Sequence, residues 1–218
     1  MNIERAYDAV ARAYDERLRD ELSHKPLDRA LLTALLELAG AGTVADVGCG
    51  PGHVTRFLAG RHPDVLGVDL SPGMIEIARE RSPGLPFAVA GMLSLPAGDG
   101  EWAGAVALYS IIHLSPAERL AAFRELARSI RPGGWLLVSF HVDAAGVAAG
   151  ESTHLTTWFG SEVDVDVYFL DPEVVGRDLA AAGFSVRSTL IREPIADAEF
   201  PSRRAYLMAC AASQHPVG

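Results

Sequence analysis

The chain has 218 residues, a formal net charge of −9 at pH 7 and 49% hydrophobic residues. That length suffices for a hydrophobic core, and we expect one domain over residues 1–218. Binding to DNA or RNA relies on Lys and Arg that neutralise phosphates, so the acidic balance argues against a nucleic-acid partner. No stretch reaches about 18 apolar residues, which predicts no membrane span.

The N-terminus is charged and lacks the apolar segment of a signal peptide, so we expect a cytoplasmic protein. Cys49 and Cys210 have neither CxxC nor Cys/His spacing, and the carboxylates and histidines show no metal-ligand spacing. We therefore expect no metal site and no disulfide. The oligomeric state is open between a monomer and a homodimer.

Two helices are expected over residues 2–39. Apolar and aromatic residues recur at helical spacing in the first, and Ser23–Pro26 interrupts the pattern. The second helix runs from about Leu27 to Ala39 and stops at the glycines that follow. The residues that carry the first pattern are Ile3, Tyr7, Val10, Tyr14 and Leu18.

A glycine-rich turn follows a short apolar strand that we expect over residues 43–48. Gly48, Gly50 and Gly52 alternate along this turn. Glycine accepts positive φ and lets a ligand approach the backbone closely. The helix expected over residues 53–60 directs its free N–H groups to the same place. This arrangement indicates a ligand site at the turn.

Two carboxylates flank the turn. The next expected strand, 64–69, ends in Asp69, which is placed to accept hydrogen bonds from ribose hydroxyls. Asp46 lies two residues before Gly48, where it would repel a pyrophosphate. A ligand with a free amino group and a sulfonium charge would tolerate Asp46, and S-adenosylmethionine carries both. The residues therefore indicate a nucleotide-type site and favour this ligand over a dinucleotide.

Strands and helices alternate along the next part of the chain. Ser71–Pro72 and Ser115–Pro116 are typical of helix N-termini, and Arg131–Gly134 ends the second of these helices. The alternation predicts a parallel sheet with helices on both faces and a ligand at the carboxyl ends of its strands. The expected strands are 85–90, 103–109 and 135–141, and the expected helices are 71–81 and 115–130.

Residues 142–170 interrupt this alternation with small, hydroxylated and aromatic residues. We expect an insertion that shapes a binding pocket, and a small satellite core is the alternative. A helix over 171–183 and two final strands, 184–191 and 204–211, complete the chain. The aromatic residues expected to line the pocket are Trp158, Phe159, Tyr168 and Phe169.

These motifs resemble those of the class I S-adenosylmethionine-dependent methyltransferases of the small-molecule type. The resemblance covers residues 40–141 well and both ends more loosely. It implies a three-layer, Rossmann-like α/β fold with a seven-stranded, mostly parallel sheet, an antiparallel edge hairpin and N-terminal helices, in which residues 1–40 form a lid. The runs that carry it are Asp46-Val-Gly-Cys-Gly-Pro-Gly52, Gly67-Val-Asp-Leu-Ser-Pro-Gly-Met74, Leu95-Pro96, Trp102–Leu114 and Arg131-Pro-Gly-Gly-Trp135.

The resemblance also implies S-adenosylmethionine as methyl donor, S-adenosylhomocysteine as product and a small-molecule acceptor. An acid that the family often uses to bind the adenine amino group is replaced here by Gly91, so backbone groups of Met92 would take this role. Tyr14 is expected to close over the cofactor. The expected cofactor-binding residues are Tyr14, Asp46, Gly48, Gly50, Gly52, Asp69, Leu70, Met74, Gly91, Met92, Leu93 and Leu108.

Three residues are candidates for catalysis. Tyr109 ends the fourth expected strand and would lie at the floor of the site. His113 follows it and is the leading candidate for a general base, because histidine titrates near neutral pH. His141, at the end of the fifth strand, is the second. A packed, hydrogen-bonded role is the alternative for both histidines. The other histidines expected to be solvated are His24, His53, His62 and His215.

The expected activity is methyl transfer to an oxygen, nitrogen or carbon of a small molecule. An in-line displacement without a metal would gain most of its rate from positioning. Two alternatives stay open, namely a nicotinamide-dependent Rossmann oxidoreductase and a non-catalytic binder of S-adenosylmethionine. The fold by itself does not identify the acceptor.

Overall fold

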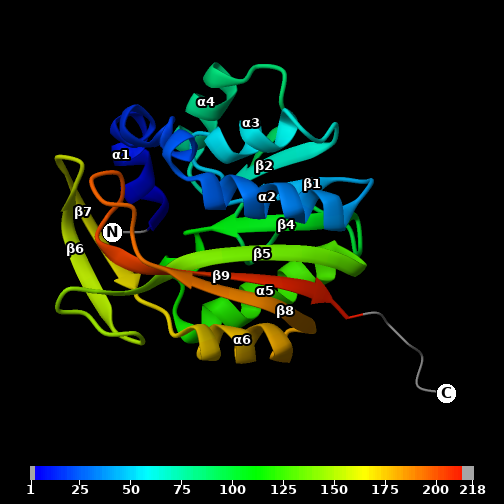
Figure 1. Cartoon of the computed structure of the whole chain (residues 1–218). Coiled ribbons are helices and arrows are strands. Elements are labelled where there is room, and N and C mark those ends of the chain that lie inside the picture. The colour runs from blue at the N-terminus through cyan, green and yellow to red at the C-terminus, as the bar shows by residue number, and fades with distance from the viewer. Residues whose placement is uncertain (1–2, 213–218) are drawn as a thin grey trace.

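The structure, a computed structural model, describes residues 3–212. A seven-stranded sheet forms its centre, with the strand order β3-β2-β1-β4-β5-β9-β8 (Figure 1). Strands β1 to β5 are parallel, and β9 pairs antiparallel with β5 and β8. This confirms the predicted fold class. The strands are β1 (Val44–Val47), β2 (Val65–Asp69), β3 (Phe87–Val89), β4 (Trp102–Leu108), β5 (Ile130–Ala144), β8 (Phe184–Arg192) and β9 (Ser202–Ala211).

Helices cover both faces of the sheet. Figure 1 shows α2 and α3 on one face and α5 and α6 on the other. Leu35 of α2 packs with Val106 in one buried cluster, and Phe123 of α5 packs with Ala105 in the other. The alternation of strands and helices thus places an apolar layer on each side of the sheet. The helices are α1 (Ile3–Leu18), α2 (Pro26–Ala39), α3 (His53–Ala59), α4 (Pro72–Arg81), α5 (Pro116–Ser129) and α6 (Pro172–Ala181), with the short 3-10 helices η1 (Glu21–His24) and η2 (Ile111–His113).

The helix-start signals in the sequence form the expected caps. The Ser71 hydroxyl accepts a hydrogen bond from the backbone N–H of Met74 at 3.0 Å. Ser115 and Glu118 form a reciprocal capping box at the start of α5. Asp171 caps α6 through its side chain. These caps fix the residues at which α4, α5 and α6 begin, and hence the lengths of the loops that precede them.

Some strand boundaries differ from the expectation. The strand expected over 135–141 is longer, because β5 begins opposite Trp102 and its far end pairs with β9 as far as Ala144. The strand expected over 85–90 is shorter, and only Phe87–Val89 pairs with β2. Both changes come from pairing partners distant in sequence, which decide how far a strand extends.

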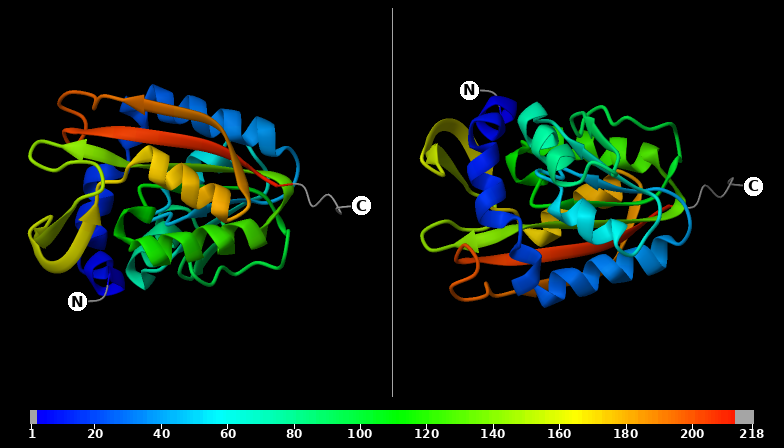
Figure 2. Two further views of the ribbon diagram at one scale, coloured as in Figure 1. Left: turned by 90° about the horizontal axis from the view of Figure 1, so that it is seen from below. Right: turned by 90° about the horizontal axis from the view of Figure 1, so that it is seen from above.

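The insertion expected over 142–170 contains a second, two-stranded sheet. Strands β6 (Ser152–Trp158) and β7 (Ser161–Tyr168) form an antiparallel hairpin. Val163 and Val165 of β7 are buried in one cluster with residues of α1. Both views in Figure 2 show α1 and this hairpin beside each other at one end of the main sheet. Residues 142–144 belong to β5 rather than to the hairpin.

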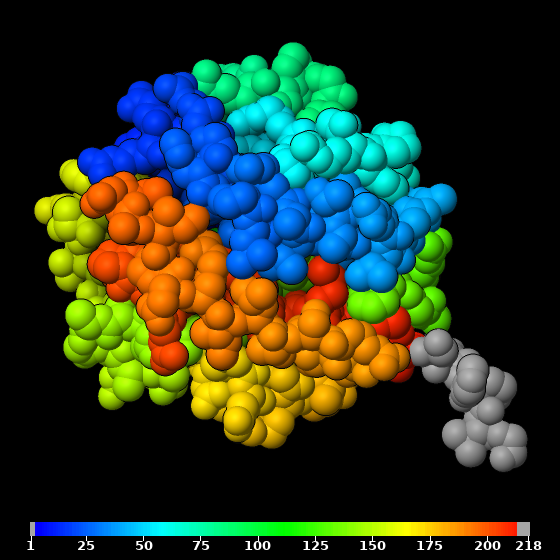
Figure 3. All heavy atoms as spheres, viewed as in Figure 1, coloured from blue at the N-terminus to red at the C-terminus, as the bar shows by residue number. Residues whose placement is uncertain are grey.

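The segment 193–201, which joins β8 to β9, lies near the same end of the sheet. Figure 3 shows this part of the chain (orange) on the surface between the N-terminal helices (blue) and the hairpin (yellow). Three segments far apart in sequence therefore meet there. Within residues 3–212, the structure contains no helix with the length and hydropathy needed to cross a membrane.

Candidate active site

The glycine turn after β1 has the backbone conformation that its sequence predicts. Gly48, Gly50 and Gly52 have φ angles of 78°, 53° and 79°. A Cβ atom on Gly48 would lie 2.3 Å from Cβ of Ser110, so this position has no room for a side chain. The N–H of Gly48 donates to the carbonyl of Val68 at 2.7 Å and ties the turn to β2. The turn therefore presents bare backbone at the carboxyl ends of β1 and β2.

Asp69 holds the turn through its carboxylate. Its Oδ2 accepts the N–H of Gly50 at 2.7 Å, and its Oδ1 accepts the N–H of Ser71 at 2.9 Å. Burial raises the pKa of Asp69, and the two N–H bonds act in the opposite direction. A carboxylate offers about four lone-pair positions, so two more hydrogen bonds can be accepted. Asp69 thus has the capacity that a ribose diol requires.

Asp46 lies beneath the turn and is buried. Its Oδ2 accepts a hydrogen bond from the Thr55 hydroxyl of α3 at 2.6 Å. Burial raises the pKa of Asp46 to about 6, although the bond from Thr55 lowers it. This contact supports the expected role in orienting the turn; a contact with a ligand amino group stays a prediction.

An apolar shelf follows Asp69 at the carboxyl ends of β2 and β3. Leu70, Val89 and Leu93 expose 37%, 48% and 51% of their surface, which is unusual for large apolar residues. Gly91 and Met92 are half-buried beside them. The shelf is accessible to a flat apolar group such as adenine.

Two of the expected cofactor residues lie deeper than this shelf. Met74 is fully buried in a cluster with Val10 of α1. Leu108 is half-buried and packs against the cluster of α2 and α3. Their contact with a cofactor stays a prediction.

Helix α1 is anchored over the turn. The Asp8 carboxylate accepts hydrogen bonds from the Ser71 hydroxyl at 2.5 Å and from the N–H of Gly73 at 2.8 Å. A Cβ atom on Gly50 would lie 3.8 Å from Cε1 of Tyr14, so the Tyr14 ring covers the turn. The contact expected between Tyr14 and a cofactor stays a prediction.

Tyr14, whose ring covers the turn, also lines a cavity of about 740 Å³. Its walls come from α1 and η1, the ends of β4 and β5, the hairpin, and residues 197–200. Tyr109, His113 and His141, the three candidates for catalysis, all line it. The structure thus brings together residues that the sequence placed on two separate segments.

One wall of the cavity is aromatic. Trp158 and Phe159 stack with ring centroids 5.3 Å apart, and Tyr14 meets both rings edge-on at 5.8 Å. The Tyr7 ring lies 5.2 Å from Trp158. Such edge-to-face contacts stabilise the packing of α1 against the hairpin. Of the four aromatic residues expected to line a pocket, Trp158 and Phe159 do so. The other two lie outside it: Phe169 is buried, and Tyr168 is half-buried against the core.

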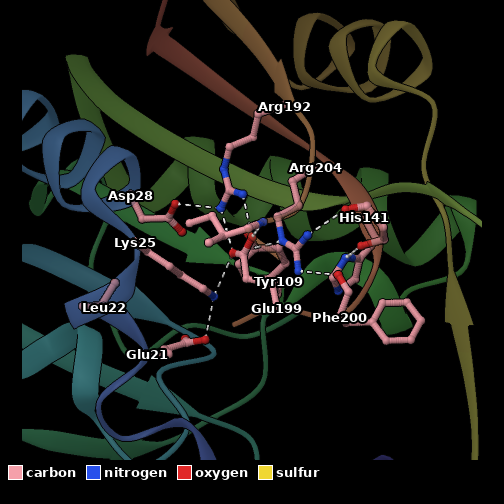
Figure 4. Close-up of polar contacts among 12 residues, drawn as sticks. Glu21, Leu22, Lys25, Asp28, Tyr109, His141, Arg192, Glu199, Phe200 and Arg204 are labelled. Carbon is pink, nitrogen blue, oxygen red and sulfur yellow. Dashed lines mark hydrogen bonds and ion pairs between the residues drawn. The ribbon is translucent and has the colours of Figure 1, made fainter. Parts of the chain in front are cut away.

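The opposite wall is charged (Figure 4). Lys25 bonds to Glu21 at 2.6 Å and lies 3.5 Å from Glu199. Arg192 holds both oxygens of Glu199 at 2.6 and 2.8 Å. Arg204 lies 3.3 Å from the same carboxylate. Burial acts to raise the pKa of Glu199, but these cations, with Arg192 first, lower it to about 2. The wall is therefore a permanently charged network.

Tyr109 occupies the floor of the cavity with a left-handed φ of 54°, a conformation that is uncommon outside glycine. Its hydroxyl lies 3.0 Å from that of Tyr206, which itself donates to Asp28 at 2.9 Å. Since the Tyr206 proton is directed at Asp28, Tyr109 donates to Tyr206. Burial and the charge of Asp28 raise the pKa of Tyr109.

The two candidate bases have different surroundings. His113 Nδ1 lies 2.8 Å from the Asp166 carbonyl, and its Nε2 lies 2.8 Å from the Tyr7 hydroxyl. Burial lowers the pKa of His113. His141 bonds through Nδ1 to the Ser202 hydroxyl at 2.6 Å. Burial, followed by the charges of nearby cations, lowers the pKa of His141 to about 3. Their catalytic roles stay predictions.

Sequence reasoning missed the charged wall. Two signals were available: Lys25 is the single lysine of the chain, and Arg204 comes directly before the apolar run of the final strand. The expectation of solvated histidines was wrong for two of them: His53 is buried against Glu21 and His62 against the carbonyl of Gly42. His24 is exposed, and His215 lies outside the described residues.

Comparisons with known proteins agree with this geometry. Residues 44–134 match a family model described as a methyltransferase domain. Trans-aconitate 2-methyltransferase of Methylobacterium nodulans is 43% identical over 112 residues, which cover 49% of this chain and 41% of that protein. The chain spans about half the length of the curated relatives it matches.

Solved structures share the fold over most of the chain. A SAM-dependent methyltransferase of Methanosarcina mazei superposes with a TM-score of 0.72 at 20% identity, covering 84% of this chain and 98% of its own. DhpI in complex with S-adenosylhomocysteine superposes with a TM-score of 0.69 at 19% identity, covering 96% of this chain and 94% of its own. These structures show the same fold, which extends beyond the residues that match the methyltransferase-domain model.

Proposed function

We propose that this chain, in which residues 44–134 match a methyltransferase domain, is a class I S-adenosylmethionine-dependent methyltransferase that transfers a methyl group to a small-molecule acceptor. One observation carries the proposal: the Asp69 carboxylate holds the bare Gly50 backbone and keeps two acceptor positions free, next to an exposed apolar shelf. The carboxylate suits the hydroxyls of a ribose, and the apolar shelf suits an adenine ring.

The chain's own residues fit the cofactor at each part. Asp69 would accept the ribose hydroxyls, and Leu70 and Leu93 would pack on adenine, with Met92 offering backbone groups in place of the missing acid at Gly91. Tyr14 would cover the part that lies over Gly50. S-adenosylmethionine supplies, when bound, a methyl group on a positively charged sulfur that is already a good electrophile.

The acceptor would occupy the 740 Å³ cavity that Tyr14 lines. Its volume suits a small molecule rather than a macromolecule. We treat residues 1–218 as one domain, in which residues 1–40 cover the cofactor and the insertion 142–170 shapes the acceptor pocket. The contacts of α1 with β7 and of η2 with β7 support this assignment.

The contribution of the chain to the reaction is positioning. Tyr109 at the floor and the aromatic wall would hold the acceptor, while α1, the hairpin and residues 197–200 would exclude water from it. Orientation alone can supply about 7–11 kcal/mol of a barrier. We expect no metal requirement, so that EDTA leaves turnover unchanged; restoration of an EDTA-abolished activity by magnesium would contradict this.

Calorimetric titration tests the proposal. We expect S-adenosylhomocysteine to bind with a Kd of about micromolar and NADH not to bind. Binding of NADH alone would favour the oxidoreductase alternative and contradict the proposal. Turnover is then measured with methyl-labelled S-adenosylmethionine, with trans-aconitate, the acceptor named for one relative, among the first acceptors tested. Binding of S-adenosylhomocysteine to a protein that methylates no acceptor would favour the non-catalytic alternative.

A further inference from the structure

We propose that the acceptor carries an anionic oxygen group, a carboxylate or a phosphonate, which Lys25 and Arg204 bind beside Tyr109. The inference rests on the proposed methyl transfer and names the class of acceptor. Both cations line the cavity, and both are buried, with 5% and 2% of their surface exposed. Figure 4 shows them on two sides of Tyr109, coming from the N-terminal segment and from β9.

The distances place both positive charges at the cavity floor. Lys25 Nζ lies 5.3 Å from the centroid of the Tyr109 ring, and the Arg204 guanidinium carbon lies 6.0 Å from it. The His141 ring lies 5.1 Å from the same ring. Tyr109 directly follows β4, and the glycine turn directly follows β1, the neighbouring strand. An anion held by these two cations would therefore lie next to the cofactor turn.

Arg204 retains unused hydrogen-bonding capacity. A guanidinium has five N–H donors. Arg204 uses one on the Ser202 carbonyl at 2.6 Å and one on the Phe200 carbonyl at 3.0 Å. Its Nε is buried and makes no hydrogen bond within residues 3–212, although Glu199 lies 3.3 Å away. Nε faces Glu199 as an ion pair, so two of the five N–H donors of Arg204 have no assigned partner among the described residues, and a ligand oxygen that accepts from them would be stabilised.

The acids of the charged wall are already occupied. Glu199 binds Arg192 through both oxygens and accepts the N–H of Ile195 at 2.7 Å. Glu21 binds Lys25 through one oxygen and His53 through the other. Lys25 and Arg204 are each ion-paired with one of these acids, and all four side chains line the cavity.

The pKa of His141 reflects the charges of the side chains around it. After burial, the charges of Arg204 and Lys25 are the next largest causes of its low pKa, and the opposing charge of Glu199 ranks below both. At His141 the two cations therefore outweigh Glu199, whereas at Tyr109 the charge of Asp28 ranks above both cations. An anion beside His141 would be attracted by the two cations, and a protonated amine would be repelled.

The candidate bases give an independent reason for an anionic acceptor. His113 Nε2 already accepts the Tyr7 hydroxyl. His141, with a pKa of about 3, is a weak base, and the Tyr109 hydroxyl has a raised pKa. A hydroxyl acceptor would have to lose its proton to one of these groups. An anionic oxygen is a nucleophile without such a step.

The resulting step is balanced without a base. A lone pair of the anionic oxygen forms the new O–CH3 bond while the methyl–sulfur bond breaks, and that bond's electron pair stays on sulfur. A carboxylate and a sulfonium become a methyl ester and a neutral thioether, and no proton is released. Lys25 and Arg204 would orient the attacking group, which is the contribution that positioning requires.

The single lysine of the chain supplies a direct test. Protein labelled with 13C at the lysine Cε gives one NMR signal from the cavity. The sample is saturated with S-adenosylhomocysteine and titrated at constant ionic strength with acetate, methylphosphonate or ethylammonium. We expect a saturable shift of the Lys25 signal with at least one anion and none with ethylammonium. Comparing acetate with methylphosphonate identifies which oxygen acid is preferred.

Two arginine variants complete the test. Arg204→Gln should weaken anion binding at least tenfold, and Arg204→Lys, which keeps the charge, should weaken it less. Arg203→Gln is the matched control, because Arg203 precedes Arg204 on β9, is exposed and pairs with Asp143. No saturable shift with either anion in the wild-type protein, or an equal shift in a folded Arg204→Gln variant, would overturn the inference. Failure of S-adenosylhomocysteine to bind would instead overturn the proposed function.

Discussion

The hydroxyl of Tyr7 donates a hydrogen bond to Nε2 of His113 at 2.8 Å, across 106 residues of sequence. The direction follows from the other ring nitrogen: Nδ1 faces the Asp166 carbonyl at 2.8 Å, and a carbonyl only accepts. His113 therefore carries its proton on Nδ1 and connects α1 to β7. This contact joins the two segments that cover the candidate active site.

Removal of the Tyr7 hydroxyl should loosen α1. We expect Tyr7→Phe to cost about 1 kcal/mol, because one partly buried hydrogen bond is lost while the ring contact with Trp158 is kept. Hydrogen exchange of the α1 amides should become faster, with the amides of α5 unchanged. Equal protection of α1 in both proteins would show that the bond does not hold the helix.

His113 itself can be tested as a base or as a connecting residue. If it connects α1 to β7, His113→Ala should weaken binding of S-adenosylhomocysteine and leave the pH profile of kcat unchanged in shape. A general base would give the other result, a large fall in kcat at unchanged cofactor affinity with loss of the limb set by its pKa. Turnover measured between pH 5 and 9 separates these outcomes.

Tyr14 should contribute to cofactor binding through its ring. Its Cε1 atom lies over Gly50, and the ring meets Trp158 and Phe159 edge-on. We expect Tyr14→Ala to weaken S-adenosylhomocysteine binding by about tenfold, or about 1.4 kcal/mol, and Tyr14→Phe to bind almost as the wild type does. Calorimetry on both variants is the measurement. An affinity lost equally in Tyr14→Phe would assign the role to the hydroxyl.

The cofactor side of the site follows from local sequence. Gly48, Gly50 and Gly52 adopt positive φ as predicted, and Asp69 lies beside them because β1 and β2 pair in register. Such features depend on residues within about 25 positions of each other, where turn chemistry and strand alternation are informative. The fold class was accordingly predictable.

The acceptor side depends on contacts between distant residues. Lys25, Glu199 and Arg204 meet only because η1, the segment 193–201 and β9 end at one place. The hairpin over 152–168 was expected only as an insertion, although Val163 and Val165 alternate with aspartates as in a half-buried strand. A local sequence pattern does not indicate which element packs on such a strand. In this chain α1 packs on it.

Glu199 should make stability depend on pH. Its pKa is lowered to about 2 in the folded protein from 4.5, so its stabilising contribution is complete above pH about 4.5 and is lost as the pH falls toward 2. We expect Glu199→Gln to cost about 3 kcal/mol at pH 7, because it leaves buried cations without their partner. Urea unfolding at several pH values should show this difference shrinking below pH 4.5. A difference that stays constant with pH would exclude the assigned ionisation.

Gly48 should not tolerate a side chain. Gly48→Ala would place Cβ 2.3 Å from Ser110 Cβ at a φ of 78°, so we expect a loss of more than about 2 kcal/mol. Gly84→Ala is the matched control, since nothing lies within 4 Å of its Cβ and its φ is not positive. That control should be neutral or slightly stabilising. Similar unfolding free energies for the two variants would contradict the described turn.

The most direct test of the proposed cofactor site is the affinity for S-adenosylhomocysteine of the wild-type protein, of Asp69→Ala, and of Asp64→Ala as a control outside the site. Asp69 bonds to the turn and keeps two acceptor positions, whereas Asp64 accepts the Thr43 hydroxyl before β2. The account predicts binding at about micromolar Kd in the wild type and in Asp64→Ala, and at least about a tenfold loss in Asp69→Ala. Undetectable binding in the wild type, or equal affinity in all three proteins, would contradict it.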